Sequence, residues 1–376
     1  MKFRVERDAL ADAVGWTAKA LPSRPSVPVI AGVMLRVADG QLHVSSFDYE
    51  VSSQVSVEVQ AEADGAALAS GRLLAEITRA LPAKPVEVAA VGSHLELVCG
   101  SARFTLPTMP VEDYPTLPDM PASAGTVEAS AFARAVAQVA VVAGRDDTLP
   151  LLTGVCVEIE ADTMTLLATD KYRLAVRELT WHPNTPEASL TALIPARMLA
   201  DTAKALGPLG GSVTVALSRG GAGTGMIGFM GGARRTTSRL LDGDFPKVRN
   251  LLSDHHASTA RIATAPLIEV AKRIALVAER THPIRLSFSE DGLTVEAGGS
   301  EDARASEAMD CVYAGEPMRV GFNYTYLLEG LGLMNAPTVL LGVNDPQKPV
   351  TLTPVNEDGE IIPGYRYVMM PLRTGS

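Results

Sequence analysis

The stretch PVIAGVMLRVADGQLHVSSFD, residues 28–48, returns in altered form as PLLTGVCVEIEADTMTLLATD, residues 150–170. The same proline, glycine and closing aspartate occur in both, and position 28 corresponds to position 150, an offset of 122 residues. Solenoid repeats are much shorter, at about 20–50 residues, so a repeat of this size indicates whole domains.

The repetition continues outward from these two stretches. Residues 71–81 match residues 196–206, and DYP at 113–115 matches DFP at 244–246. A third, fainter copy is indicated by residues 323–334, which resemble the segment at 195–206. Three similar domains in a row suggest a curved or closed assembly whose inner wall repeats.

Each copy is expected to hold two helices packed on antiparallel strands, which is an α+β fold. The alternating residues Val33, Leu35 and Val37 correspond to Val155, Val157 and Ile159, and such alternation is typical of a strand with one buried face. Ser130 and Thr264 are predicted to cap helices. The expected helices lie near residues 8–20, 72–84, 130–145, 196–206, 266–280 and 323–334.

Domain boundaries are expected where turn-forming residues collect. Residues 110–121 are rich in proline, and residues 253–259 are polar. The expected domains are therefore residues 1–121, 122–253 and 254–376.

The composition is that of an ordinary soluble globular protein, with 47% hydrophobic and 20% charged residues in 376 positions. No apolar run approaches the ~20 residues of a membrane helix. The first residues, MKFR, lack the apolar core of a signal peptide. We therefore expect a cytoplasmic protein.

No set of residues predicts catalysis, a cofactor or a metal site. Cys99, Cys156 and Cys311 lie far apart in apolar segments and are predicted to be buried thiols. The GTGMIG run at 223–228 has the spacing of a dinucleotide-binding turn, but it does not open a helix. Asp254, His255 and His256 lack further ligands at metal spacing, and Asp146-Asp147 has no histidine or nucleophile nearby. The protein is thus not expected to be an enzyme.

The net charge of −10 argues against capture of nucleic acid by the whole surface. The expected helices nevertheless carry more basic than acidic residues. Their basic members are Lys19, Arg72, Arg79, Lys84, Arg134, Arg145, Arg197, Lys204, Lys272, Arg273 and Arg280. These side chains could belong to ordinary solvated helix faces, or they could line one concave surface that faces phosphates.

Helix geometry limits what such a surface could enclose. Six helices packed about 9–10 Å apart close a circle roughly 18 Å across, which leaves only about 8 Å inside. Twelve helices give roughly 36 Å and leave about 26 Å, enough for a duplex and a layer of water. A ring around DNA would therefore need two chains joined head to tail with two-fold symmetry.

Several motifs resemble one known family over essentially the whole chain. They are MKF at 1–3, Arg24-Pro25, ATDKYRLAV at 168–176, DFP at 244–246, GFN at 321–323 and YVMMPLR at 367–373. Together with the threefold repetition, they resemble the bacterial sliding clamp, the β subunit of the replicative DNA polymerase holoenzyme. The resemblance implies a homodimeric ring on duplex DNA that serves replication as a processivity factor, is loaded by a clamp loader, and tethers replicative and repair polymerases without doing chemistry.

The family also has a pocket that binds short peptide motifs of its partners. An apolar groove with methionines adapts to varied peptides, whereas a few polar groups fix their register. Judged from the sequence alone, the same residues would pass for core. The resemblance implies that the pocket is lined by Leu152, Thr169, Tyr172, Arg173, Leu174, Pro246, Leu251, Asn323, Tyr326, Val350, Val368, Met369, Met370, Pro371, Leu372 and Arg373.

The chain departs from many relatives at Lys171-Tyr172, where they have Gly-His, so the pocket rim is expected to be bulkier. For DNA, the resemblance implies contacts from Arg24, Lys19, Arg72, Arg79, Arg134, Arg197, Lys204, Lys272 and Arg273. For the subunit interface it implies Phe104, Leu106, Leu276 and Val277, which could equally be ordinary core residues.

Two other classes of function stay open beside the clamp. One is a monomeric scaffold that collects peptide motifs without encircling DNA. The other is an enzyme that uses a nucleotide through the glycine-rich segment.

Overall fold

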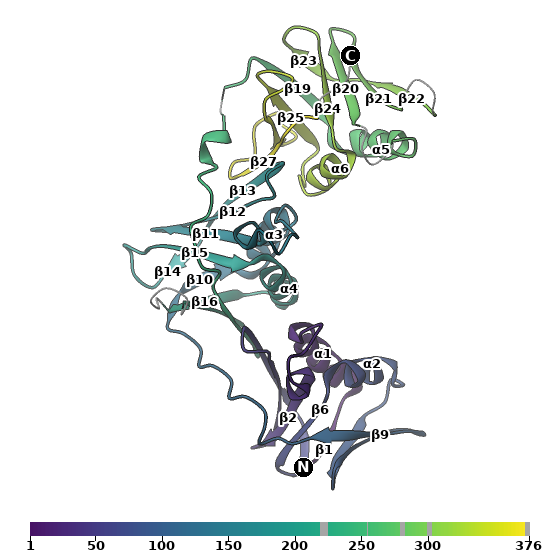
Figure 1. Cartoon of the computed structure of the whole chain (residues 1–376), viewed down its shortest axis with the longest axis vertical. Helices are drawn as coiled ribbons and strands as arrows, with labels where there is room; N and C mark the ends of the chain where they lie inside the picture. Colours follow the sequence, from purple (N-terminus) through teal and green to yellow (C-terminus); the bar gives the residue numbers. More distant parts are fainter. Residues whose placement is uncertain (219–224, 254, 279–282, 299–302, 373–376) are drawn as a thin grey trace. The chain divides into compact units, whose positions relative to one another are not determined.

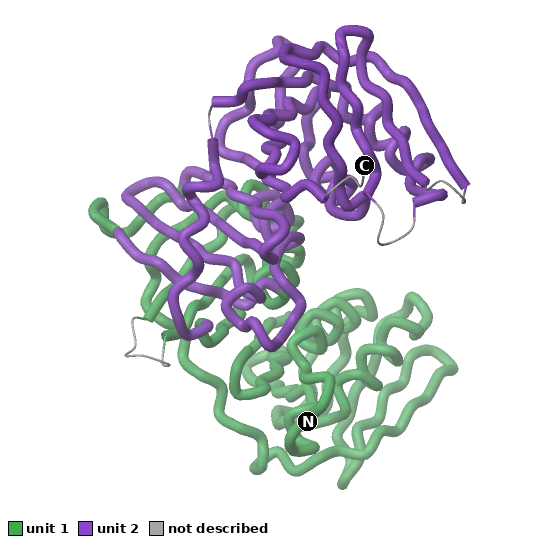
Figure 2. Tube along the Cα trace, turned by 45° about the horizontal axis from the view of Figure 1, so that its top comes forward, with its two compact units in different colours: residues 1–133, 181–188, 197–240 green, residues 134–180, 189–196, 241–376 purple. Residues whose placement is uncertain are grey.

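The protein is described here from a computed structural model, which covers residues 1–218, 225–253, 255–278, 283–298 and 303–372. The chain forms two compact units (Figure 2). Unit 1 comprises residues 1–133, 181–188 and 197–240, and unit 2 comprises residues 134–180, 189–196 and 241–376. The expected second domain is shared between the units, and the division into three domains at 121 and 253 stays a prediction.

Unit 1 is built on one antiparallel sheet of fourteen strands, in the order β14-β10-β16-β17-β18-β4-β3-β2-β6-β9-β8-β7-β1-β5. Its two halves join where residues 234–238 of β18 pair with residues 51–55 of β4. The strands are β1 (Lys2–Val5), β2 (Gly32–Ala38), β3 (Gln41–Phe47), β4 (Val51–Glu58), β5 (Gln60–Ala63), β6 (Gly65–Ser70), β7 (Val86–Val91), β8 (His94–Cys99), β9 (Ala102–Met109), β10 (Ser123–Glu128), β14 (His182–Pro183), β16 (Ser212–Ser218), β17 (Met226–Gly231) and β18 (Arg234–Arg239).

Two helices pack together on this sheet (Figure 1), namely α1 (Arg7–Thr17) and α2 (Gly71–Ala80). Leu10 of α1 and Leu74 of α2 meet the strand residues Val33, Leu35 and Val37 in one core cluster. The alternation predicted for this strand is thereby confirmed. Unit 1 also holds residues 129–133 of α3 (Ala129–Ala140) and residues 197–206 of α4 (Ala196–Leu206).

Unit 2 contains two antiparallel sheets, of nine strands in the order β15-β11-β12-β13-β27-β26-β25-β19-β23 and of four in the order β22-β21-β20-β24. Helices α5 (Thr264–Ala275) and α6 (Tyr324–Gly332) pack on each other and on these strands. The strands are β11 (Gly154–Glu160), β12 (Thr163–Thr169), β13 (Arg173–Thr180), β15 (Ser189–Pro195), β19 (Ser258–Ala263), β20 (Ile284–Ser289), β21 (Gly292–Ala297), β22 (Ala305–Met309), β23 (Val312–Ala314), β24 (Met318–Phe322), β25 (Thr338–Val343), β26 (Val350–Val355) and β27 (Tyr365–Met369).

The expected α+β class, with helices on antiparallel strands, is confirmed, but two predicted helix caps are wrong. The backbone N–H groups of Ser130 and Ala131 donate to the Glu128 carboxylate at 2.9 and 2.6 Å, so Glu128 and not Ser130 caps α3. Thr264 is the first residue of α5, and its side chain forms no cap. An acidic side chain such as Glu128 suits the N-cap position because it also meets the positive end of the helix dipole.

The cysteine prediction holds for two of three thiols. Cys99 and Cys156 are buried, whereas Cys311 is only partly buried. Burial raises the pKa of the Cys156 thiol to about 12, so it stays protonated at neutral pH. All three cysteines are free.

Candidate functional site

The turn between β12 and β13 in unit 2 is held by an aspartate. Asp170 Oδ1 accepts hydrogen bonds from the backbone N–H groups of Tyr172 and Arg173, both at 3.0 Å. Lys171 between them has a φ of 82°, a region that side chains other than glycine rarely adopt. The first repeat builds the same turn at Asp48, which accepts from the N–H groups two and three residues on. The shared local geometry explains why aspartate ends both copies of the repeated stretch.

Arg173, the first residue of β13, lies beneath this turn with only 7% of its side chain exposed. Its Nε donates to Asp170 Oδ2 at 2.9 Å, and it forms a second ion pair with Glu329 of α6. A further N–H donates to the Val141 carbonyl at 2.9 Å, and the guanidinium lies 4.2 Å from the ring centre of Tyr326. The side chain therefore fastens β13 to α6 and to the end of α3.

The tyrosines around Arg173 are held in the protonated form. Burial raises the pKa of Tyr367 to about 12, although the nearby Arg173 charge acts in the opposite direction. The Tyr367 hydroxyl donates to the Tyr326 carbonyl at 2.9 Å. Burial alone would lower the pKa of Arg173, but its tyrosine and carboxylate partners raise it overall. Arg173 thus keeps its positive charge at neutral pH, opposite the Asp170 and Glu329 carboxylates.

A cavity of about 560 Å³ opens beside this cluster, and all of its lining residues belong to unit 2. The volume is within the range of small-molecule and peptide sites. Four of the expected pocket residues line it, namely Leu152, Tyr172, Arg173 and Tyr326. The other lining residues are Ala143, Gly144, Arg145, Asp146, Leu149, Asp170, Lys171, Thr325 and Glu329.

Eight of the nine further residues were not expected in the site, whereas Lys171 was expected at its rim. In the sequence, Asp146 stood out only as half of the acidic pair Asp146-Asp147. Its Oδ1 instead accepts from the backbone N–H and the hydroxyl of Thr148, which lowers its pKa. The repeated aspartate at 48 and 170 was the one available signal, because a turn built twice around the same residue also places its neighbours.

The remaining expected pocket residues divide by exposure. Thr169, Leu174, Val350, Val368 and Met369 are buried, and Leu174 and Val368 belong to a core cluster. Asn323 is the N-cap of α6, where its side chain accepts from the N–H groups of Thr325 and Tyr326. Arg373 lies outside the described residues.

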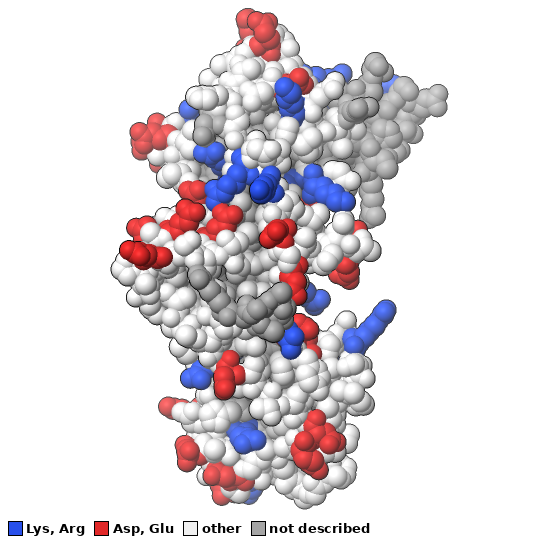
Figure 3. Space-filling view, turned by 60° about the vertical axis from the view of Figure 1, so that its left-hand side comes forward, with Lys and Arg blue, Asp and Glu red and all other residues white. Residues whose placement is uncertain are grey.

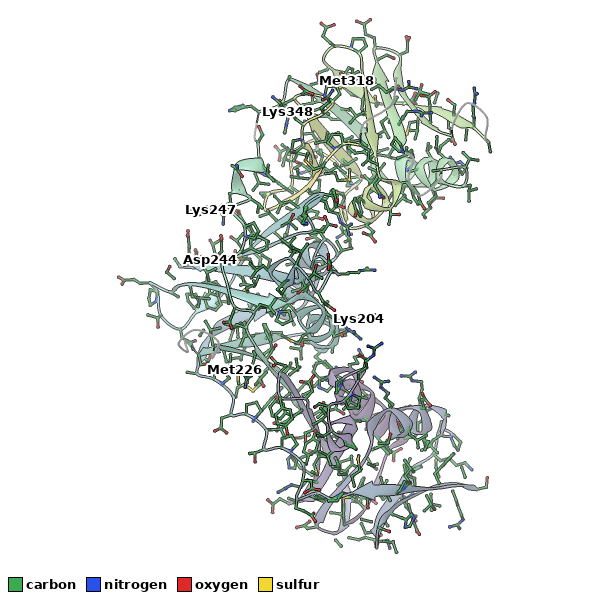
Figure 4. All side chains as sticks on the ribbon, viewed as in Figure 1. Lys204, Met226, Asp244, Lys247, Met318 and Lys348 are labelled. Atoms are coloured by element: carbon green, nitrogen blue, oxygen red, sulfur yellow. The ribbon has the colours of Figure 1, made fainter. Side chains whose placement is uncertain are left out.

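An exposed apolar rim adjoins the cavity at Tyr172, which is 56% exposed. The Met370 N–H donates to the Tyr172 carbonyl at 2.7 Å, so the two residues are neighbours. Met370 and Leu372 are exposed large hydrophobic residues after β27, and Leu251 is another in the segment before β19, where Pro246 is also exposed. Asp244 and Lys247 mark this segment in Figure 4. Large apolar side chains that stay in solvent beside a cavity are typical of a binding surface.

Every basic residue expected to contact DNA is exposed. Lys204, for example, projects from α4 (Figure 4). Lys272 and Arg273 are already paired, with Glu269 and Glu307. Arg72 donates to the Pro22 carbonyl at 3.0 Å, which anchors the loop that carries Arg24. Acidic and basic side chains are interspersed on the face in Figure 3, and Arg280 lies outside the described residues.

The expected interface residues separate in the same way. Phe104 of β9 is 37% exposed and Leu276, directly after α5, is 85% exposed. Val277 is partly buried. Leu106 is 2% exposed and belongs to the core cluster of unit 1. For Leu106 the alternative of an ordinary core residue therefore holds.

The glycine-rich run at 223–228 and the Asp254-His255-His256 group were not expected to form a nucleotide or metal site. Residues 223–224 and Asp254 lie outside the described part of the chain. Among the described residues, no group of three or more metal-ligating side chains occurs. No helix of the described chain is long and apolar enough to cross a membrane.

Repeated helix pairs on antiparallel sheets, exposed basic helix residues and an apolar-rimmed cavity together define a class of clamp-type proteins. Sequence models of the DNA polymerase III beta subunit match nearly the whole chain: its N-terminal domain at residues 1–118, its central domain at 126–247 and its C-terminal domain at 249–373. The chain belongs to the DNA polymerase III beta subunit family.

Individual relatives agree with this assignment. The chain is 53% identical to a beta sliding clamp of Streptomyces coelicolor over 99% of both chains. It is 49% identical to a beta sliding clamp of Micrococcus luteus, over 83% of this chain and 99% of the relative. A solved sliding clamp of Pseudomonas aeruginosa, bound to griselimycin, is 26% identical with a TM-score of 0.88 and full coverage of both chains.

Proposed function

We propose that this protein is a DNA polymerase processivity factor, a homodimeric ring that encircles duplex DNA and slides on it without sequence specificity. The observation that carries the proposal is the set of exposed basic residues on helices of a chain with net charge −10. An acidic protein repels DNA in general, so cations concentrated on one class of element favour a specific surface for phosphates.

Two unpaired strand edges support a head-to-tail dimer. Residues 102–107 of β9 pair only with β8, and within the described chain their other edge has no partner. Strand β22 likewise pairs only with β21 on one side. Open edges favour pairing with another chain, and one edge lies in each unit. Joining unit 1 of one copy to unit 2 of the other uses both edges and closes with two-fold symmetry.

A variant at Leu276 tests the dimer. Leu276 directly follows α5, and α5 packs on β22, so Leu276 lies near the open edge of β22. We expect Leu276→Asp to give monomers, since an aspartate at an apolar contact would be desolvated without a partner. Sedimentation at micromolar concentration should report twice 39.6 kDa for the wild type and 39.6 kDa for the variant. Val312→Asp, at another largely exposed apolar residue, in β23, is the control and should stay dimeric.

The alternative function is a monomeric scaffold that collects peptide motifs without encircling DNA. A wild-type mass of one chain in the same sedimentation experiment would favour the scaffold. Loss of the dimer in Val312→Asp but not in Leu276→Asp would place the contact at β23 instead.

Contacts with DNA are proposed to run through phosphates and to read no bases, since sliding requires weak, uniform contacts. Lys19, Arg24, Arg79, Arg197 and Lys204 are the strongest candidates, because no ion pair of the described residues occupies them. Arg72 contributes by anchoring the Arg24 loop. Lys272 and Arg273 contribute less, because Glu269 and Glu307 offset their charge. Arg134 is the last of the residues proposed to contact DNA phosphates.

The cavity of unit 2 and its apolar rim are proposed to bind peptide motifs of partners. These partners are the clamp loader, replicative and repair DNA polymerases, and other proteins with the motif. Tyr172 and Met370 supply exposed apolar contact, whereas the buried Leu174, Val368 and Met369 support the floor. The protein itself is proposed to catalyse no reaction and to need no cofactor. Its proposed location is the bacterial cytoplasm, where the DNA lies.

A further inference from the structure

A second cavity, of about 570 Å³, lies in unit 1 and is separate from the peptide pocket. Its floor is the face of β2, β3, β4 and β18, and its wall is the extended segment after β9, which Figure 1 shows running toward β10. The Tyr114 hydroxyl anchors the wall by accepting a hydrogen bond from the Phe47 N–H at 2.7 Å. Burial raises the pKa of Tyr114 to about 12, so this anchor does not ionise at neutral pH.

The strand register arranges the floor in two rows that cross the sheet. In one row Arg36 of β2 pairs with His43 of β3, which pairs with Ser56 of β4. His43 Nδ1 and Ser56 Oγ are 2.9 Å apart, so they share a hydrogen bond. In the other row Ser45 pairs with Gln54, and Gln54 pairs with Arg235 of β18. An arginine therefore stands near each end of the floor.

The equivalent face of unit 2 shows that the fold does not require polar side chains at these floor positions. By the offset of 122, Met34, Ser45 and Gln54 correspond to Cys156, Leu167 and Val176. Those three belong to an apolar cluster that Val248 joins and against which Phe245 packs. Val248 and Phe245 lie in the segment that corresponds to the wall. The same position is thus filled with side chains in unit 2, whereas it remains a cavity in unit 1.

The charge of the face is also reversed between the two copies. Arg36 and Ser56 correspond to Glu158 and Glu178, and Glu158 is paired with Arg249 of its own linker segment. None of the residues lining the unit 1 cavity is an acid. Within the described residues, Arg36 and Arg235 form no ion pair, although Glu112 and Asp113 lie in the adjoining wall segment. Two exposed guanidinium groups over a cavity without carboxylates are complementary to an anionic ligand.

We propose that this cavity binds an extended acidic peptide segment that crosses β2, β3, β4 and β18. Arg36 and Arg235 lie three strands apart, roughly 14 Å at 4.7–4.9 Å a strand, and one row apart along the strands, about 7 Å, so their backbone positions are separated by roughly 16 Å. An extended chain advances about 3.4 Å a residue, so carboxylates four residues apart stand about 14 Å apart and point to the same side, and the long arginine side chains span the remaining difference. Each arginine then receives one carboxylate.

The lining also specifies the residues between the two acids. The central residue points to the floor, where Ser45, Gln54 and Ser56 offer hydroxyl and amide groups, so it is polar. The two others point to the wall, where Tyr114 and Leu117 offer apolar surface. The recognised pattern is therefore acid, apolar, polar, apolar, acid.

Fluorescence anisotropy with a labelled seven-residue peptide tests the proposal. The probe carries glutamates at its second and sixth positions, leucines at the third and fifth, and serine at the fourth. We expect saturable binding to the full chain, weakened about tenfold by Arg36→Gln and again by Arg235→Gln. Arg4→Gln, at an exposed arginine of β1 outside the cavity, should leave the affinity unchanged. Thermal unfolding of each variant shows that it folds.

Two control ligands distinguish the outcomes. A probe with glutamates moved to the second and fifth positions presents its acids on opposite sides, and we expect it to bind at least tenfold more weakly. Citrate tests a small-molecule site, and equal displacement by citrate at the affinity of the peptide would overturn the choice of a peptide. Absence of saturable binding, or equal losses in Arg4→Gln and Arg36→Gln, would overturn the site itself. None of these outcomes depends on whether the protein forms a ring.

Discussion

Arg173→Ala is expected to lower the free energy of unfolding by about 3 kcal/mol, because it leaves Asp170 and Glu329 as partly buried carboxylates without their cation. It also removes the donor to the Val141 carbonyl and the contact with the Tyr326 ring. Differential scanning calorimetry should show the effect as a fall in Tm of roughly 6–12 °C.

Two variants make this stability test specific. Arg173→Lys keeps the charge but has a single nitrogen, which cannot reach all the acceptors that the three separate nitrogens of Arg173 meet, so its loss should be intermediate. Arg261→Ala removes an arginine of the same unit that donates to one neutral carbonyl, Gly359, at 2.7 Å, and should cost less than about 1 kcal/mol. Equal destabilisation by Arg173→Ala and Arg261→Ala would contradict the role given to the Arg173 network.

Tyr172→Ala is expected to weaken a peptide derived from the replicative polymerase about 30-fold, or about 2 kcal/mol, with Met370→Ala following in the same direction. Both side chains are exposed and adjoin the cavity, so their loss removes contact area from the complex without emptying the core. Isothermal titration calorimetry should show the weaker binding. Thermal unfolding of the variants should show an unchanged Tm.

The choice of Tyr172 rather than Arg173 for this titration follows from the structure. Loss of affinity in an Arg173 variant would report both peptide contact and local unfolding. Val312→Ala serves as the control, because Val312 is exposed in the same unit but does not line the cavity. Unchanged affinity in Tyr172→Ala would show that the peptide binds elsewhere.

Much of the fold could be predicted because the same sequence pattern recurs along the chain. The helix at 196–206 was predicted with its observed bounds, since the matching segment at 71–81 indicates the same element. Helix starts were harder. Ser130 and Glu128 are both competent caps, and only the backbone path decides that the Glu128 carboxylate reaches the free N–H groups.

The candidate site was less predictable, for a physical reason. Arg173 gains its partners from positions 141, 326 and 329, which only the tertiary fold brings together. Leu106 was also hard to place, because Phe104 is apolar too and lies on the same face of β9, so the strand pattern does not tell that only Leu106 is buried. The polar floor at Arg36, His43 and Gln54 needed the strand register before its two rows could be recognised.

Retention on circular DNA tests most directly whether the protein holds a duplex by enclosing it. The clamp is loaded on closed circles, the salt concentration is raised, and half of the sample is then cut once with a restriction enzyme. Phosphate contacts alone weaken steeply with salt, whereas a closed ring is held by topology. We expect the protein to stay on the intact circles and to leave the cut ones, and equal loss from both would contradict the account.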